Sequence, residues 1–262
     1  MGDHDTWYTL LSPEFWHALE HNAAEHLARD WRWMMFAATQ FSLVHVAGAL
    51  LTVLFLIFVA LRYRKSVEDA TGGVVPPRSF GLAAMADRFV GAVYNLSADV
   101  MGEKNAKRFL PFTGTIGLFI FCCNLQGLIP GFMPPTDTLK TNLGLALLVF
   151  VVYNLFGLKE NGLAYLAHFA GPKIGGFRWM FPLFIPLEIV SHLARPVSLS
   201  LRLTGNMIAD HKVVAVVAVV VPLFVPLPFL LLGTVVCIVQ TLVFTLLTIL
   251  YIGLAVEHAE EH

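Results

Sequence analysis

The sequence predicts an all-α integral membrane protein, with about five membrane-crossing helices and one amphipathic surface helix. The first observation is composition: 57% of the 262 residues are hydrophobic and only 13% are charged, whereas soluble domains carry about 25% charged residues. The second is distribution, because the charges gather in three stretches and are absent elsewhere. The third is a run of 44 residues, 213–256, without Asp, Glu, Lys, Arg or His. Long uncharged segments of this kind are typical of membrane-crossing helices.

The same composition argues against several other classes of protein. A formal net charge of −1 provides no global basic field, so we expect no nucleic-acid partner. The cysteines Cys122, Cys123 and Cys237 lie in apolar runs, where packing is a better explanation than a disulfide or a metal site. We expect no nucleotide site, because no G-x-x-x-x-G-K-[ST] loop is present, and we expect no metal or other cofactor.

The chain divides into a polar N-terminal segment, residues 1–33, and a single membrane domain, residues 34–262. Residues 34–61 carry no charged side chain and are long enough to cross about 30 Å of hydrocarbon. The first crossing helix is therefore expected over 34–62. In residues 80–108, apolar side chains recur at helical spacing while charged side chains fill the other faces. This pattern predicts an amphipathic helix on the membrane surface.

The next two crossing helices are expected over 111–133, which ends among prolines, and over 139–158, which is short but uncharged. A straight helix over 213–256 would be about twice as long as the bilayer is thick. Proline removes a backbone donor and breaks a helix, so the chain is expected to end in two long helices, 180–221 and 227–257, that form a hairpin. The prolines at the break are Pro222, Pro226 and Pro228.

The basic residues predict the orientation of the chain. Of the 17 Lys and Arg residues, eight lie within 62–108, and Lys159, Lys173 and Arg178 lie in a later loop. By the positive-inside rule both regions are cytoplasmic. The N-terminus is then outside, and the C-terminal tail is cytoplasmic.

One predicted membrane helix carries polar residues that are costly there. A charged residue at the centre of a membrane helix costs about 2.5–3.5 kcal/mol on insertion scales, yet residues 188–212 contain several. Five polar residues with spacings of 4, 3, 7 and 4 form a stripe on one helix face, which requires water or a partner along it. The members of this stripe are Glu188, His192, Arg195, Arg202 and Asn206.

Arg202 stands out within the stripe. Arginine keeps its proton in a protein, so it is a poor proton carrier but a good fixed positive charge. Its natural partner is a carboxylate, and no carboxylate of the spanning segments is an obvious mate, so the mate is expected on another chain. For Lys212, and for Arg195 beside Pro196, a structural role at a helix end is an equally good explanation.

The segment Pro196-Val-Ser-Leu-Ser-Leu-Arg-Leu-Thr-Gly-Asn-Met resembles the signature of the a subunit of the F-type (rotary) ATP synthase. Residues 240–251, Gln-Thr-Leu-Val-Phe-Thr-Leu-Leu-Thr-Ile-Leu-Tyr, and residues 124–130, Asn-Leu-Gln-Gly-Leu-Ile-Pro, are also similar to this family. The resemblance extends from about residue 35 to the end of the chain.

The resemblance implies a role for each matching residue. Arg202 matches the essential arginine that faces the ring of c subunits, and Asn206 and Gln240 match polar residues near it. Glu188, Ser191 and His211 match positions of the aqueous half-channels. The last two helices are then steeply tilted and curve around the ring.

The implied function is that of a non-catalytic, proton-conducting stator subunit in a bacterial inner membrane. Two offset half-channels would pass protons to and from carboxylates of the rotating ring, and this flow would drive ATP synthesis. The implied partners are the c-subunit ring, the b subunits of the peripheral stalk, the other ATP synthase subunits and the lipid bilayer.

The sequence also departs from the family. Many members carry a channel His or Glu seven residues before the glutamine, where this chain has Gly233. We expect His211, preceded by Asp210, to serve the outer half-channel with water instead. Residues 1–33 match nothing in the family.

Two other functions fit parts of the sequence. His17-Ala-Leu-Glu-His21 fits an H-x-x-E-H zinc pattern, but a polar amphipathic helix explains it better. A secondary transporter would also suit intramembrane charges, but such folds usually contain two related halves, and no internal repeat is visible in the sequence.

Overall fold

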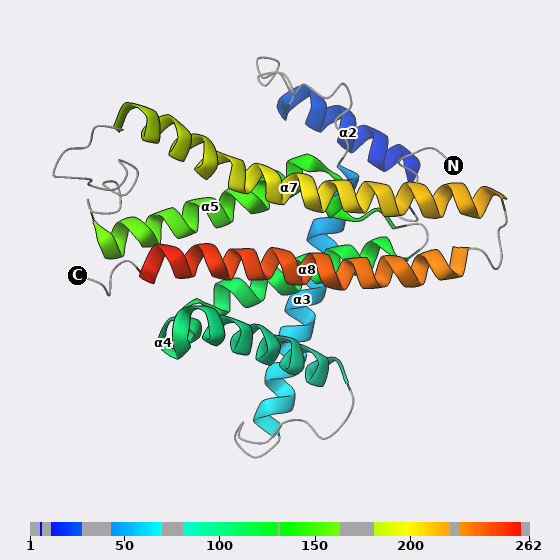
Figure 1. Ribbon diagram of the computed structural model, residues 1–262. Coiled ribbons are helices and arrows are strands. Elements are labelled where there is room, and N and C mark those ends of the chain that lie inside the picture. The colour runs from blue at the N-terminus through cyan, green and yellow to red at the C-terminus, as the bar shows by residue number, and fades with distance from the viewer. Residues whose placement is uncertain are drawn as a thin grey trace.

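The computed structural model describes residue 6 and residues 12–27, 43–69, 81–129, 132–162, 181–220 and 226–257. The regular structure within these residues is helical, which confirms the all-α fold class (Figure 1). In chain order the helices are α2 (Pro13–Leu27), α3 (Val44–Asp69), α4 (Leu82–Gly127), the short 3₁₀ helix η2 (Pro135–Asp137), α5 (Leu139–Asn161), α7 (Phe181–Val220) and α8 (Pro226–Glu257).

Among the described residues, four helices are long and apolar enough to cross a membrane. They comprise Val44–Lys65 of α3, Ala84–Gly127 of α4, Leu139–Asn161 of α5 and Pro226–Val256 of α8. This supports a multi-pass membrane protein. Helix α7, which carries the polar stripe, is not among these four. Residues 34–42, where the first crossing helix was expected to begin, lie outside the described residues.

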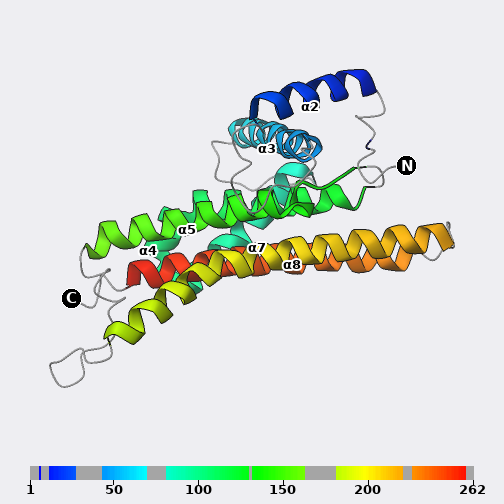
Figure 2. The ribbon, with the colours of Figure 1, turned by 90° about the horizontal axis from the view of Figure 1, so that it is seen from above.

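Helices α5, α7 and α8 lie side by side and run across the direction of α3 (Figures 1 and 2). Helices α7 and α8 are antiparallel and form the predicted hairpin; α7 ends at Val220 and α8 begins at Pro226. They contain 40 and 32 residues, which correspond to about 60 and 48 Å of helix. Since both exceed the hydrocarbon thickness of about 30 Å, they fit a bilayer only when strongly tilted.

Helix α4 changes direction sharply at Gly102, so that its two arms diverge (Figure 1). Gly102 has φ 77° and ψ 158°, a conformation that a residue with a Cβ rarely adopts. The sequence analysis separated a surface helix from a crossing helix between residues 108 and 111, whereas the structure makes the break at Gly102 and continues as a helix through Pro111. The second arm therefore begins among the charged residues that follow Gly102.

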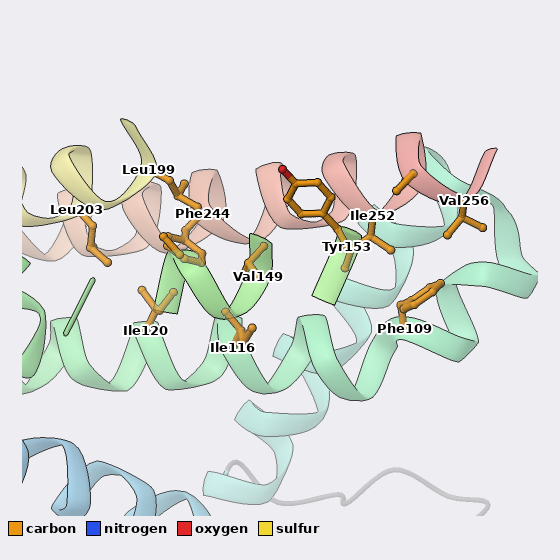
Figure 3. Packing of buried hydrophobic residues seen from close by; sticks show 12 residues of the cluster. Phe109, Ile116, Ile120, Val149, Tyr153, Leu199, Leu203, Phe244, Ile252 and Val256 are labelled. Atoms are coloured by element: carbon orange, nitrogen blue, oxygen red, sulfur yellow. The ribbon is translucent and has the colours of Figure 1, made fainter. Parts of the chain in front are cut away.

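The core lies where the second arm of α4 meets α5, α7 and α8 (Figure 3). Each helix contributes large apolar side chains that are almost completely buried. They are Phe109, Ile116 and Ile120 from α4, Val149 and Tyr153 from α5, Leu199 and Leu203 from α7, and Phe244, Ile252 and Val256 from α8. This packing holds the hairpin of α7 and α8 against α4 and α5.

Large apolar side chains also cover the outer faces of several helices. Leu50 and Leu54 of α3 and Leu231 of α8 are well exposed. Such faces are unfavourable in water but match hydrocarbon or a partner helix. The outer surface therefore agrees with an intramembrane location.

Candidate functional site

Arg202 lies on the exposed side of α7. Within the part of the chain that the structure describes, its guanidinium forms no hydrogen bond or ion pair. The neighbours Leu203 and Thr204 are buried against the bundle, so the helix fixes the backbone while the charge points away from the core. A fixed cation at this position is available to a group from outside the chain.

Asn206, one helical turn after Arg202, connects the two long helices. Its Nδ2 donates a hydrogen bond of 2.8 Å to Oε1 of Gln240 on α8. The Gln240 side chain is only 3% exposed, and its Nε2 has no hydrogen-bond partner among the described residues. The structure thus brings together two of the residues that the sequence singled out, and leaves one buried donor for a water molecule.

Asp210 lies directly against Gly233 of α8. A Cβ built at residue 233 would be 2.5 Å from Oδ2 of Asp210 and 2.9 Å from Oδ1. Real Cβ atoms essentially never come so close to another heavy atom. The glycine that the sequence analysis noted as a departure from the family therefore makes room for the carboxylate.

His211 is held between two backbone carbonyl groups. Its Nε2 lies 2.9 Å from the oxygen of Gly127 on α4, and its Nδ1 lies 3.0 Å from the oxygen of Met207. Carbonyl oxygens only accept hydrogen bonds, and a neutral imidazole has a single N–H. A neutral ring can therefore donate a hydrogen bond to only one of the two carbonyl groups.

The remaining candidates, Glu188 and Ser191, lie on the other side of Arg202 along α7. Ser191 is exposed, and the Glu188 side chain lies outside the described residues. Their positions are 14 and 11 residues before Arg202, or about 21 and 16 Å along a helix axis. The structure does not bring these two residues to Asp210 and His211; it puts the two pairs on opposite sides of the arginine.

A buried polar network joins α4, η2, α5 and α7. Thr136 Oγ1 donates to Asn124 Oδ1 at 2.9 Å, and Asn142 Nδ2 contacts the Thr136 carbonyl at 2.6 Å and Thr204 Oγ1 at 2.7 Å. Within the described parts of the chain, Asn124 Nδ2 and Asn142 Oδ1 have no hydrogen-bond partner, although both residues are at most 1% exposed. Asn142, Thr136 and Thr204 were not predicted as site residues, although a polar side chain in an apolar helix is a usable signal.

The H-x-x-E-H pattern lies on α2. In the described residues, no group of three or more His, Cys, Asp or Glu side chains could hold a metal ion. Glu20, the acid of the H-x-x-E-H pattern, accepts a hydrogen bond of 3.1 Å from the backbone N–H of Leu43. It thereby joins α2 to the start of α3.

The fold and this site define a multi-pass, all-α membrane protein in which one of two long hairpin helices carries the charged residues. The family model described as ATP synthase A chain matches residues 32–253, and the chain belongs to this family. It is accordingly a non-catalytic membrane subunit.

Several bacterial proteins are similar over most of their length. A protein of Sorangium cellulosum called ATP synthase subunit a is 42% identical over 214 residues, which cover 82% of each chain. ATP synthase subunit a 1 of Syntrophotalea carbinolica is 42% identical over 217 residues, which cover 83% of this chain and 87% of the relative. ATP synthase subunit a of Bdellovibrio bacteriovorus is 39% identical over 215 residues, which cover 82% of this chain and 92% of the relative.

Proposed function

We propose that this chain is the proton-conducting stator subunit of the ATP synthase. It passes protons through two half-channels to and from carboxylates on a rotating ring of c subunits, and so couples proton flow to ATP synthesis. The observation that carries the proposal is the exposed guanidinium of Arg202, which has no partner among the described residues. A charge that cannot be neutralised by losing its proton needs an anion in the membrane, and a ring carboxylate supplies one.

The outer half-channel leads to Asp210 and His211. His211 contacts Gly127, the last residue of α4, and the loop that follows α4 is on the outer side by the positive-inside rule. Three buried atoms have no hydrogen-bond partner in the part of the chain that the structure describes, namely Asn124 Nδ2, Asn142 Oδ1 and Gln240 Nε2. They favour bound water, because each buried polar group without a partner costs about 1–3 kcal/mol. These groups give the proton a polar route from the outer surface.

The inner half-channel contains Glu188 and Ser191. These two residues are far along α7 from Asp210 and His211. This separation supports two proton routes that are offset from each other and do not form one continuous channel. Arg202 lies between them, and its positive charge repels a proton that would pass directly from one route to the other.

The ring carboxylate then completes the cycle. Protonated from the outer route, it is neutral and can face lipid, whereas its ionised form would pay a large desolvation cost there. After rotation it releases the proton into the inner route and meets Arg202, which stabilises the carboxylate ion. One elementary charge crossing 100 mV releases about 2.3 kcal/mol, so several protons are needed for each ATP.

The proposal includes the remaining partners and the location. The bacterial relatives and the apolar outer surface support a bacterial inner membrane. The distribution of Lys and Arg favours an N-terminus outside and a C-terminus in the cytoplasm. The other ATP synthase subunits, including the b subunits of the peripheral stalk, are the expected partners in the assembled complex.

Labelling from each side of the membrane tests the two half-channels. The three native cysteines are replaced, and Ser191→Cys, His211→Cys and the exposed apolar control Leu201→Cys are introduced separately. A membrane-impermeant thiol reagent should label position 211 only in right-side-out vesicles and position 191 only in inverted vesicles, with little labelling at 201. Labelling of both channel positions from the same side would contradict two separate half-channels.

A further inference from the structure

His192 belongs to the polar stripe of α7 but does not face the same way as Arg202. The two residues are ten positions apart, which corresponds to about 80° around a helix with 3.6 residues per turn. His192 is only 8% exposed, whereas Arg202 is exposed. The structure therefore divides the stripe: Arg202 points away from the bundle, and His192 points to α5.

The hydrogen bonds of His192 define the state of one ring nitrogen. Its Nε2 lies 2.8 Å from Asn154 Oδ1 and 3.2 Å from the Tyr153 hydroxyl. The amide of Asn154 cannot be flipped, because its Nδ2 donates a hydrogen bond of 2.7 Å to the carbonyl oxygen of Phe150. An amide oxygen only accepts, so Nε2 of His192 carries a hydrogen and donates it to Asn154.

This arrangement is poorly suited to proton relay through the ring. A relaying imidazole takes a proton on one nitrogen and releases one from the other. Here the nearer partner of Nε2 is an amide oxygen at 2.8 Å, which is too weakly basic to receive a proton and has no hydrogen to return, while the Tyr153 hydroxyl lies farther away at 3.2 Å. A fixed hydrogen bond between α7 and α5 is the function that this geometry does support.

The backbone of α7 lacks one helical hydrogen bond near His192. Pro196, four residues after His192, has no N–H, so the His192 carbonyl lacks its usual helical partner. The same region carries aromatic contacts: the His192 ring lies 5.1 Å from that of Phe150 and 5.4 Å from that of Tyr153. The guanidinium of Arg195 stacks 5.3 Å above the ring of Tyr251 on α8.

We propose that His192 is a positioning residue: by donating a hydrogen bond to Asn154, it holds the proline-weakened segment of α7 against α5 and so sets the place of Arg202. The effect of this contact on proton pumping rests on the proposed function. The hydrogen bond and its effect on the packing of α7 against α5 are independent of that function.

Glutamine at position 192 distinguishes a positioning role from a role in proton transfer. Its side-chain N–H group can replace the Nε2–H donor of histidine, but it does not titrate. The intact complex is prepared with His192→Gln, His192→Leu, Asn154→Leu and the double variant His192→Leu/Asn154→Leu. ATP-driven proton pumping in inverted vesicles and the amount of assembled complex are measured for each.

The proposal predicts that His192→Gln assembles and pumps within about twofold of wild type, because the buried hydrogen bond is kept. His192→Leu and Asn154→Leu should each lower the yield or the pumping of the complex by about fivefold or more, and the double variant should be no worse than the more impaired single variant. An assembled His192→Gln complex that cannot pump, or a His192→Leu complex that equals wild type, would overturn the proposal.

Arg202→Ala serves as the separate control for the proposed function. If Arg202→Ala retains full pumping, the stator function fails. In that case the comparison of Gln with Leu at position 192 still decides, from the yield of the complex, whether His192 positions α7. If His192→Leu does not assemble at all, the assembly and pumping of His192→Gln alone decide whether His192 is a positioning residue.

Discussion

The carboxylate of Asp210 on α7 occupies the space that any side chain at residue 233 of α8 would need. A Cβ at Gly233 would lie 2.5 Å from Oδ2 of Asp210. The glycine at residue 233 thus leaves room for an ionisable group between the two long helices of the hairpin.

Replacing Gly233 with alanine is expected to impair the hairpin. The added methyl group must displace the carboxylate, and overpacking of this kind costs about 1–3 kcal/mol. The thermal stability of the purified complex should fall and proton pumping should decrease. Gly144→Ala is the matched control, because a Cβ at residue 144 meets nothing within 4 Å.

The double variant Gly233→Ala/Asp210→Ala separates the steric effect of the added methyl group from the effect of losing the carboxylate in proton transfer. Removing the carboxylate relieves the clash, so the stability should return to near that of Asp210→Ala alone. Pumping should stay low, because the proposed outer half-channel has lost its carboxylate. Equal stability of Gly233→Ala and wild type would contradict the prediction and show that the Asp210 carboxylate moves aside at little cost.

Replacement of Gly117 on α4 by a larger residue is expected to destabilise the protein for a similar reason. A Cβ there would lie 2.7 Å from Oγ1 of Thr245 on α8 and 3.3 Å from its Cγ2. Small residues allow membrane helices to approach closely, so Gly117→Ala should destabilise the complex by about 1–3 kcal/mol. Thr245→Ala in the same chain should recover most of the loss in a thermal unfolding assay; a further loss would disprove the contact.

The hydrogen bond between Asn206 and Gln240 should couple the two residues energetically. A double-mutant cycle with Asn206→Leu and Gln240→Leu should give a coupling energy of about 0.6–1.7 kcal/mol, the range found for interhelical hydrogen bonds in membranes. Unfolding of the detergent-solubilised complex provides the measurement. Fully additive effects of the two substitutions would argue against the direct contact of 2.8 Å.

The ion pair of Arg108 with Glu160 should contribute little by its charge. The Arg108 side chain is 45% exposed, and exposed ion pairs contribute about 0–1 kcal/mol. Glu160→Gln should therefore change stability only slightly. Arg108→Ala should cost more, because the guanidinium also stacks on the rings of Phe109 and Phe156 at 5.2 and 5.3 Å. The reverse order of the two effects in thermal unfolding would contradict this assignment.

Much of the architecture was predictable from the sequence because membrane helices follow simple rules of length and charge. The 44 uncharged residues interrupted by prolines predicted the hairpin, and the cost of intramembrane charge directed attention to Arg202. These features depend on local composition, which a single sequence contains.

Features that depend on contacts between distant residues were not predictable. The break in α4 at Gly102 lies within an amphipathic pattern that continues past it, so the spacing of apolar residues does not reveal it. The polar stripe was expected on one face, yet packing of α5 buries His192 and leaves Arg202 exposed. The fit of Asp210 against Gly233 likewise needs the register of α7 against α8, which helical periodicity does not specify.

The most direct test of the central claim is proton pumping by the intact complex with Arg202→Ala. The exposed neighbour Leu201→Ala is the matched control, and ATP hydrolysis and the yield of assembled complex are measured in parallel. The proposed function predicts that Arg202→Ala assembles but loses both ATP-driven pumping and gradient-driven ATP synthesis, while Leu201→Ala retains them. If coupling survives in Arg202→Ala, the arginine is a structural charge, and an independent transporter becomes the better hypothesis.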